Sequence, residues 1–269
     1  MAGMSNASST IIEMRQVYKR FGPLEVLRGI DLSLAKGRTT VVIGESGTGK
    51  SVLIKHMIGL IRPDAGEIHI DGQRVDPLHE KQWVPIRQRF GYLFQMGALF
   101  DSLTAGENIA FPLKEHTGLS DAEIHDIVAR KLDLVGLDGV QNKWPSELSG
   151  GQRKRVALAR AIAMDPDIIL YDEPTTGLDP IRSDTINDLI IKLKDELAVT
   201  SIVVTHDMTS AFKVADRILM LTQGQFIADG TADDFRNTRD PRVRAFVTGD
   251  ADLNIIEESA TPPTRGESS

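Results

Sequence analysis

The sequence predicts an α/β fold with a parallel sheet, preceded by a sheet-rich section and interrupted by a helical one. Three observations carry this prediction. Strand-like apolar runs alternate with helical patterns in the second half of the chain, as in proteins with a parallel sheet. A glycine-rich loop lies between a predicted strand and a predicted helix, and residues 96–163 carry apolar residues at helical spacing.

The composition is that of a globular chain. Of its 269 residues 41% are hydrophobic, which is enough for one large domain or two smaller ones. No uncharged apolar run approaches the roughly 18 residues that span a bilayer, and the N-terminal residues lack the charged and apolar regions of a signal peptide. We therefore expect a soluble chain that stays in the cytoplasm.

Charge and cysteine content exclude several kinds of site. The formal net charge is −7, whereas nucleic-acid-binding domains usually have a basic excess, so we expect no nucleic-acid partner. The chain has no cysteine. Disulfides, thiolate zinc sites and cysteine nucleophiles are therefore excluded.

The opening section is predicted to be rich in strands. Alternating or continuous apolar runs indicate strands at Ile11–Val17, Leu27–Leu34, Arg38–Ile43 and Glu67–Ile70. A helical pattern at Ser51–Leu60 follows the third run. The glycine-rich loop between this strand and this helix therefore has the setting that phosphate binding requires.

Helical patterns dominate the middle of the chain, and strands return after it. Ser120 and Glu123 have the spacing of a capping box at the start of one of these helices. The later apolar runs predict strands at Ile168–Tyr171, Ser201–Thr205, Arg217–Thr222 and Gln225–Asp229. A long helical pattern at Pro180–Leu197 lies between the first two of them. After Thr248 the sequence is acidic and polar, so we expect residues 249–269 to form a mobile tail, with Leu253, Ile255 and Ile256 as its docking candidates.

The glycine-rich loop matches the pattern GxxxxGK(S/T). Its backbone N–H groups and the start of the following helix suit a nucleotide β-phosphate, its lysine can reach the β and γ oxygens, and its last serine can ligate Mg²⁺. The alternative is a surface turn, which the strand–loop–helix setting disfavours. The residues of this loop are Gly44, Glu45, Ser46, Gly47, Thr48, Gly49, Lys50 and Ser51.

Two adjacent carboxylates, Asp172 and Glu173, end the apolar strand that begins at Ile168. This places them at the carboxyl edge of the sheet, where ligands of α/β proteins bind. Asp172 suits a Mg²⁺ shared with Ser51 and the phosphates, and Glu173 then suits a general base for water. The alternative is that the pair only terminates a strand.

Two further polar residues follow strand-like runs. His206 comes after Ser201–Thr205, so it can hydrogen-bond a γ-phosphate or orient the attacking water, although a lone histidine is usually structural. Gln95 follows Gly91–Phe94, where it could sense Mg²⁺ or water and move the helical section. Taken alone, the position of Gln95 is weak evidence for such a role.

The segment from Leu148 through Ser149, Gly150, Gly151 and Gln152 opens the helical pattern Gln152–Met164. Its glycines expose N–H groups at a helix start, which makes a second anion-binding helix end. Nothing in the same chain requires two such ends. The simpler alternative is an ordinary helix cap formed by Ser149.

At these motifs the chain resembles the ATPase subunits of the ABC family, over roughly Ile11 to Thr248. The resemblance implies a P-loop NTPase (RecA-like) core with an N-terminal antiparallel β subdomain and an inserted helical subdomain. It places the ATPase domain at 1–248, with the core at about 11–95 and 164–248 and the helical subdomain at about 96–163. Glu45 departs from the proline or asparagine often found at its position, and its side chain can point away from the nucleotide.

The resemblance also implies the roles of individual residues. Glu173, His206, Lys50 and Gln95 are the catalytic residues, and Ser51, Gln95 and Asp172 hold Mg²⁺. Each ATP lies between the glycine loop of one copy and the signature of a second copy, so that two chains form two sites. The signature residues that act on the opposite site, with the D-loop aspartate, are Ser149, Gly150, Gly151, Gln152 and Asp179. Phe21 matches the adenine-stacking aromatic, although it and Tyr18 also suit ordinary packing.

A finer resemblance concerns the segments Leu93–Leu103 and Asn108–Leu113. They are similar to the ATPase of the Mla-type, Mce-associated phospholipid transporters of Gram-negative bacteria. This implies a homodimer on the cytoplasmic face of the inner membrane that powers a permease moving phospholipids between the inner and outer membranes. The implied partners are the permease, an Mce lipid-binding protein and a small STAS-domain protein, with membrane contact only through the permease.

Two alternatives remain. An importer ATPase for another small substrate has the same motifs, because the cargo does not touch this subunit. A soluble ABC ATPase of DNA repair or translation is disfavoured, because those relatives carry long coiled-coil insertions or two cassettes in one chain. The sequence therefore predicts a transport ATPase.

Overall fold

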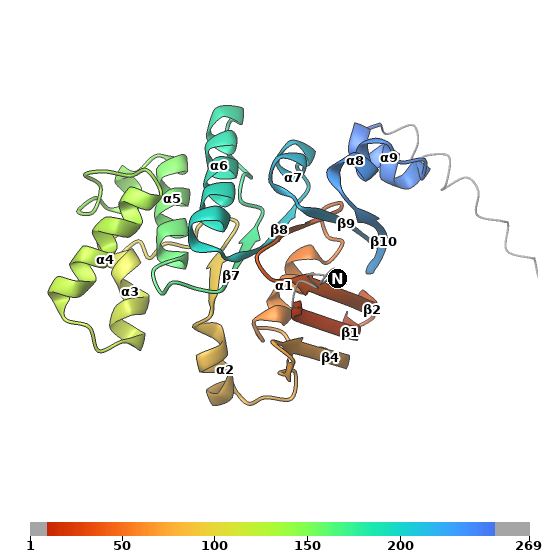
Figure 1. Cartoon of the computed structure of the whole chain (residues 1–269), viewed down its shortest axis with the longest axis horizontal. Helices are drawn as coiled ribbons and strands as arrows, with labels where there is room; N and C mark the ends of the chain where they lie inside the picture. Colours follow the sequence, from red (N-terminus) through yellow and green to blue (C-terminus); the bar gives the residue numbers. More distant parts are fainter. Residues whose placement is uncertain (1–9, 251–269) are drawn as a thin grey trace, which may run out of the picture.

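The structure is a computed structural model that describes residues 10–250, and its first sheet is antiparallel (Figure 1). This sheet has the strand order β2-β1-β4-β5. Its four strands are β1 (Thr10–Phe21), β2 (Leu24–Ala35), β4 (Ala65–Ile70) and β5 (Gln73–Arg74). Along β1 and β2 buried residues alternate with more exposed ones over much of each strand, as expected for a sheet with one covered face.

The second sheet is almost entirely parallel and has the order β10-β9-β3-β8-β7-β6, with only the β10–β9 pair antiparallel. Its central strands are buried on both faces, which explains their continuous apolar runs. Its six strands are β3 (Thr39–Ile43), β6 (Phe90–Leu93), β7 (Ile168–Asp172), β8 (Thr200–Thr205), β9 (Arg217–Thr222) and β10 (Gln225–Gly230).

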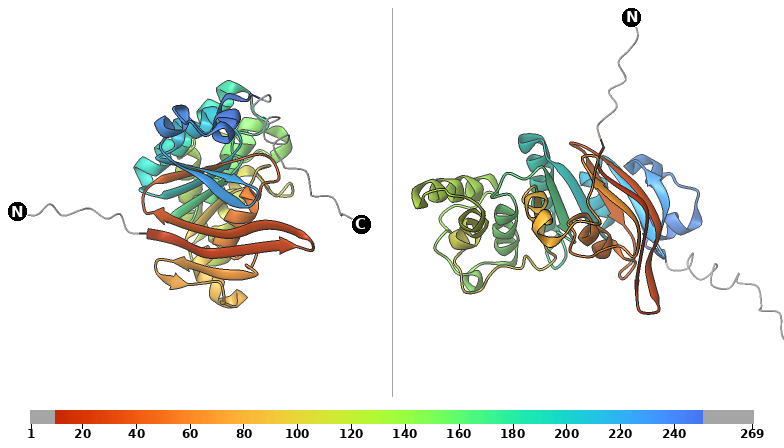
Figure 2. Two further views of the ribbon diagram at one scale, coloured as in Figure 1. Left: turned by 90° about the vertical axis from the view of Figure 1, so that its right-hand side faces the viewer. Right: turned by 90° about the horizontal axis from the view of Figure 1, so that it is seen from below.

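Helix α1 (Lys50–Met57) lies between the two sheets (Figures 1 and 2). Its buried residues Leu53 and Ile54 belong to one apolar cluster with Met14 of β1 and with Val42 and Ile202 of the parallel sheet. The glycine-rich loop before α1 is therefore fixed by the packing of both sheets.

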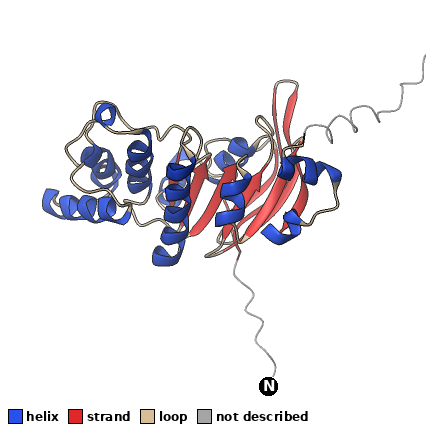
Figure 3. Cartoon of the chain, turned by 90° about the horizontal axis from the view of Figure 1, so that it is seen from above, coloured by secondary structure: helices blue, strands red, loops and turns tan. Residues whose placement is uncertain are grey.

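The opposite face of the parallel sheet is covered by helices (Figure 3). Helices α6 (Pro180–Leu197) and α7 (Met208–Val214) cover it directly, and the sequence beyond β6 extends to one side as α3 (Ala105–His116), α4 (Asp121–Leu134) and α5 (Gly150–Ala161). The remaining short helices are α2 (Glu80–Arg87), η1 (Pro145–Glu147), α8 (Ala232–Arg236) and α9 (Pro241–Thr248).

The predicted fold class is confirmed: a parallel α/β core, an N-terminal antiparallel sheet and inserted helices. The capping box at Ser120 and Glu123 is present at the start of α4. Helices α2, α7, α8 and α9 each bury only one to three residues, which is too few to predict them from periodicity. The docking candidates Leu253, Ile255 and Ile256 lie outside the described residues.

Candidate functional site

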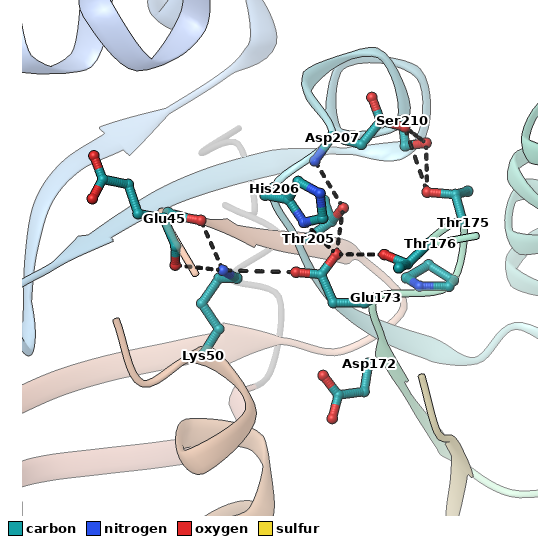
Figure 4. Close-up of polar contacts among 12 residues, drawn as sticks. Glu45, Lys50, Asp172, Glu173, Thr175, Thr176, Thr205, His206, Asp207 and Ser210 are labelled. Carbon is teal, nitrogen blue, oxygen red and sulfur yellow. Dashed lines mark hydrogen bonds and ion pairs between the residues drawn. The ribbon is translucent and has the colours of Figure 1, made fainter. Parts of the chain in front are cut away.

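Three polar segments meet at the carboxyl edge of the parallel sheet. Strands β3, β8 and β7 are neighbours, and their register pairs Ile43 with Thr205 and Asp172 with Val204. The residues that follow these strand ends therefore converge. Figure 4 shows Lys50, Glu173 and His206 directed toward one another from three different elements.

The glycine-rich loop needs its glycines for a specific backbone path. Gly44 has φ 154° and Gly49 has φ 101°. A Cβ atom on Gly44 would lie 2.3 Å from the carbonyl oxygen of Leu221, and one on Gly49 would lie 2.9 Å from the side chain of Val26. No side chain caps α1 at Gly49, so the helix start faces the loop with its positive end available for an anion.

Lys50 is buried beneath this loop. Its Nζ donates to the carbonyl oxygens of Gly44 at 2.7 Å and Glu45 at 2.9 Å, and lies 3.7 Å from Oε1 of Glu173. Burial lowers the pKa of Lys50, while the charge of Glu173 opposes that shift. The Glu45 side chain is directed away from Lys50 (Figure 4), so this loop position contributes its backbone.

Asp172 lies between two hydroxyl donors. Ser51 Oγ donates to its Oδ1 at 2.7 Å, and the Tyr92 hydroxyl donates to its Oδ2 at 3.0 Å. Burial and the Asp172 charge raise the pKa of Tyr92, so this phenol remains a donor. A hydroxyl and a carboxylate oxygen side by side are hard ligands of the kind Mg²⁺ takes together with nucleotide phosphates. The residues present therefore fit that ion.

Glu173 is held at its carboxylate by three side chains. Oε2 lies 2.9 Å from Nδ1 of His206 and accepts from the hydroxyls of Thr176 and Thr205, each at 3.3 Å. Its backbone has φ 49°, and the next residue is Pro174. This left-handed conformation is uncommon for glutamate and persists only where its surroundings enforce it.

A second polar network fixes the segment that carries His206. Asp207 Oδ2 accepts from Ser210 Oγ at 2.5 Å and from Thr175 Oγ1 at 3.4 Å, and Asn187 of α6 donates to Ser210 Oγ at 2.9 Å. Asp207 also caps α7 by accepting from Thr209 N. The histidine-bearing turn is therefore bound to the segment that follows Glu173, whereas His206 itself is half exposed.

The signature segment begins α5 with a capping box. Ser149 Oγ accepts from Gln152 N at 3.3 Å, and Gln152 Oε1 accepts from Ser149 N at 2.9 Å. The geometry of an ordinary cap is thus present. No hydrogen bond or ion pair within residues 10–250 joins Leu148–Gln152 to the glycine-rich loop, so the two anion-binding helix ends are not linked in one chain by such contacts.

The other predicted site residues lie around this cluster. Phe21 ends β1 and is 47% exposed, with Lys19 Nζ 5.4 Å from its ring centroid. Gln95 is exposed after β6, and no side-chain hydrogen bond connects it to the described cluster. Asp179 caps α6 by accepting from Arg182 N at 3.0 Å. The roles of these residues stay predictions.

Sequence reasoning missed four residues of the site: Tyr92, Thr176, Thr205 and Lys154. Lys154 of α5 is buried and donates to the carbonyl oxygens of Glu173 and Pro174. One signal was available for it, because Lys154 is at position i+3 from the small residue Gly151 and i−4 from Leu158, on the apolar side of α5. The hydroxyl contacts had no comparable signal, because they join residues far apart in the sequence.

The fold and the glycine-rich loop define a P-loop nucleotide-binding protein with a RecA-like core. A family model described as "ABC transporter" matches residues 27–176. The chain therefore belongs to the ABC transporter family, and its activity is ATP hydrolysis coupled to transport.

Curated relatives and solved structures agree with this assignment. The chain is 40% identical over 249 residues to the "Intermembrane phospholipid transport system ATP-binding protein MlaF" of Escherichia coli, covering 93% of each chain. It is 43% identical to the "Probable ribonucleotide transport ATP-binding protein mkl" of Mycobacterium leprae, covering 88% of this chain and 69% of the relative. The dimeric ATP-binding cassette MJ0796 bound to ADP and Pi superposes with a TM-score of 0.77 at 33% identity, covering 82% of this chain and 99% of that one.

Gly44→Ala should weaken ATP binding about tenfold or more. The added Cβ would press on the Leu221 carbonyl and displace the loop, and overpacking of this kind costs about 1–3 kcal/mol. Isothermal titration with ATP measures the change. Gly37→Ala is the matched control, because Gly37 also has a positive φ but its Cβ would meet no atom within 4 Å. Equal affinities of the Gly44 variant and the wild type would contradict the prediction.

Proposed function

We propose that two copies of this chain bind and hydrolyse two ATP molecules to power a permease that moves phospholipids between the inner and outer membranes. The observation that carries this proposal is the 40% identity, over 93% of both chains, to a phospholipid transport ATP-binding protein. The dimeric cassette with ADP and Pi supports the arrangement of two copies.

Phosphate binding uses the loop and Lys50. The N–H groups of the loop and of the helix start at Gly49 donate to the phosphate oxygens. Lys50 Nζ contacts only carbonyl oxygens and Glu173 in the described chain, so it can transfer these bonds to the β- and γ-phosphates. Phe21, on the hairpin beside the loop, stacks on the adenine, since β2 reaches the loop through the contact of Val26 with Gly49.

Ser51 and Asp172 would hold Mg²⁺, with Gln95 as a further ligand. The bound ion would supply positive charge that offsets the phosphate charge. The Tyr92 hydroxyl bond to Asp172 keeps that carboxylate turned toward Ser51. The donor set supports this placement.

Glu173 is the general base for the attacking water. Phosphoryl transfer leaves little covalent work for the protein, so the position of this carboxylate matters most. Its contacts with His206, Thr176 and Thr205 fix Oε2, and Oε1 faces Lys50. His206 then hydrogen-bonds the γ-phosphate or orients the attacking water.

The signature helix completes the site of the second copy. In the described chain the N-terminus of α5 makes no polar contact with its own glycine-rich loop, and the helix end is suited to an anion. Ser149, Gly150, Gly151 and Gln152 therefore contact the nucleotide that the partner copy binds, and Asp179 lies at the same interface. ATP joins the copies, and hydrolysis separates them.

An apolar groove supports a permease partner. It has a volume of about 470 Å³ and lies between α2, β6, α3 and α5. Phe100 and Phe111 are exposed at its edge with ring centroids 4.8 Å apart, and Met96 beside it is 87% exposed. Clustered exposed apolar side chains mark protein contact surfaces. We assign this groove to a helical segment of the permease.

The finer assignments rest on the family resemblance. The helical subdomain is placed at 96–163, supported by α3, α4 and α5 falling within those bounds, with the core at 11–95 and 164–248. No helix in residues 10–250 is long and apolar enough to cross a membrane. The permease then holds the ATPase at the cytoplasmic face of the inner membrane, together with an Mce protein and a STAS-domain protein.

A second candidate cargo is a ribonucleotide, because the mycobacterial relative bears that name. The two candidates share every residue of the ATPase site, since cargo contacts the permease and not this chain. They differ in the molecule that should copurify with the complex, which is a phospholipid in one case and a ribonucleotide in the other.

Glu173→Gln should lower ATP turnover at least 100-fold, the contribution typical of a general base, and leave ATP binding intact. The neutral amide cannot take a proton from water, so the variant should accumulate as an ATP-bound dimer in size-exclusion chromatography. Asp126→Asn removes one exposed carboxylate on α4 and is the control. Undiminished turnover by the Glu173 variant would remove Glu173 from the role of base.

Two inactive variants should regain activity when mixed. Lys50→Met disables the phosphate loop and Gly150→Asp disables the signature, so each homodimer has two defective sites. A mixed dimer has one site with both parts intact, and the mixture should recover up to about one quarter of wild-type activity if one of two sites works in half of the dimers. Phosphate release measures it. A mixture as inactive as its components would contradict sites shared between copies.

Native purification of the tagged chain from membranes should recover a permease together with bound phospholipid. Mass spectrometry of the proteins and the lipid extract makes the measurement. Phe111→Asp should abolish permease recovery while ATP binding by the isolated chain is unchanged, because Phe111 lines the groove and not the nucleotide site. A complex that contains ribonucleotides and no phospholipid would favour the second cargo.

A further inference from the structure

Helix α5 carries a buried lysine on the face that meets the catalytic turn. Lys154 is 6% exposed, and its Nζ donates to the carbonyl oxygens of Glu173 at 3.1 Å and Pro174 at 2.8 Å. A buried ammonium group is strongly unfavourable unless hydrogen bonds compensate it. Methionine would fill the same volume without that penalty, so the charge at this position requires a reason.

The backbone that Lys154 contacts is strained. Glu173 adopts φ 49° and precedes a proline, although residues before proline favour extended conformations. Its N–H donates to Val204 O at 2.9 Å, and its carbonyl accepts from Thr176 N at 3.3 Å and from Lys154. Lys154 is the side chain that bonds both carbonyl oxygens on either side of the Glu173–Pro174 turn.

The two ends of Glu173 are thus fixed by different parts of the fold. Oε2 of the carboxylate is held by Thr205, the last residue of β8, and by Thr176 and His206, which follow β7 and β8. The main chain is held by α5, which belongs to the inserted helices. Loss of the lysine would release the main chain of this turn, and the carboxylate contacts alone would then have to hold Glu173 in place.

We propose that Lys154 is a positioning residue for the Glu173 base: its two bonds to the carbonyls of Glu173 and Pro174 hold the left-handed turn that aims the carboxylate. This rests on the assignment of Glu173 as base in the proposed function. Lys154 Nζ bonds backbone carbonyls, so it acts through the position of Glu173 and not on the reacting atoms.

The same contact connects two nucleotide sites. Lys154 lies four residues after Gly150, at the start of the helix whose N-terminus serves the partner copy's ATP. Any displacement of α5 would therefore also move the donor that holds Glu173 of this chain's own site. Nucleotide binding at the partner copy's site can in this way change the position of Glu173 in this chain's own site.

The first test compares Lys154→Met with wild type in the full chain. We expect kcat to fall about 10- to 100-fold with KM for ATP within twofold, because misplacing a reacting group by about 1 Å has effects of that size. Lys154→Arg retains donors and should restore much of kcat. Lys192→Met is the control, since Lys192 Nζ also donates to a backbone carbonyl, that of Leu134 at 3.0 Å. It should leave kcat unchanged.

The second test shows whether Lys154 acts through Glu173. In the Glu173→Gln background, adding Lys154→Met should change the residual single-turnover rate less than twofold, because residues that act as a unit are not additive. An unchanged kcat in Lys154→Met, or an equally large loss in both backgrounds, would overturn the proposal. If Lys154→Met does not fold, Lys154→Gln, which keeps one donor, replaces it in both comparisons. Full turnover by Glu173→Gln alone would instead overturn the assignment of the base.

Discussion

The parallel pairing of β3, β8 and β7 is the constraint on which the site depends. Its register brings Ile43 beside Thr205 and Asp172 beside Val204. The residues at the ends of these strands therefore lie at one edge of the sheet. They are the glycine-rich loop after β3, Asp172 and Glu173 at the end of β7, and His206 after β8. A slip of one residue in this register would turn every side chain to the other face of the sheet and separate Ser51 from Asp172.

The charged side chains of the site are paired within the chain by contacts that a bound nucleotide can replace. Lys50 Nζ lies 3.7 Å from Oε1 of Glu173 and donates to two loop carbonyls, so its charge is compensated by contacts that phosphate oxygens can replace. In the same way, the Ser51 hydroxyl donates a hydrogen bond to Asp172. Phosphate and Mg²⁺ would replace these contacts with stronger, charge-assisted ones.

Helix α5 links the turn that carries Glu173 to the edge of the apolar groove. On α5, Ser149 caps the N-terminus, Lys154 contacts the catalytic turn, and Arg160 donates to the carbonyls of Gly97 and Ala98 beside the apolar groove. One rigid helix therefore contacts three functional regions. A permease segment in the groove would act on the segment after β6 and, through α5, on the base.

The sequence by itself determined the parts with local signatures. The loop Gly44–Ser51, the strand that ends in Asp172 and Glu173, and the α5 start at Ser149 follow from spacing, apolar pattern and capping, which short stretches of chain encode. The fold class followed from their alternation. The bounds of the short helices α2 and α7 did not, because they bury only two and three residues and so show no clear apolar period.

Only the tertiary structure decided which groups surround each functional side chain. The bonds of Tyr92 to Asp172, Thr205 to Glu173 and Lys154 to the Glu173 carbonyl join residues 80, 32 and 19 positions apart. Such contacts depend on strand order and helix packing, which arise from the whole core and leave no local pattern. The motif identifies Glu173 as the proposed base, but the packing of α5 and β8 sets where its carboxylate lies.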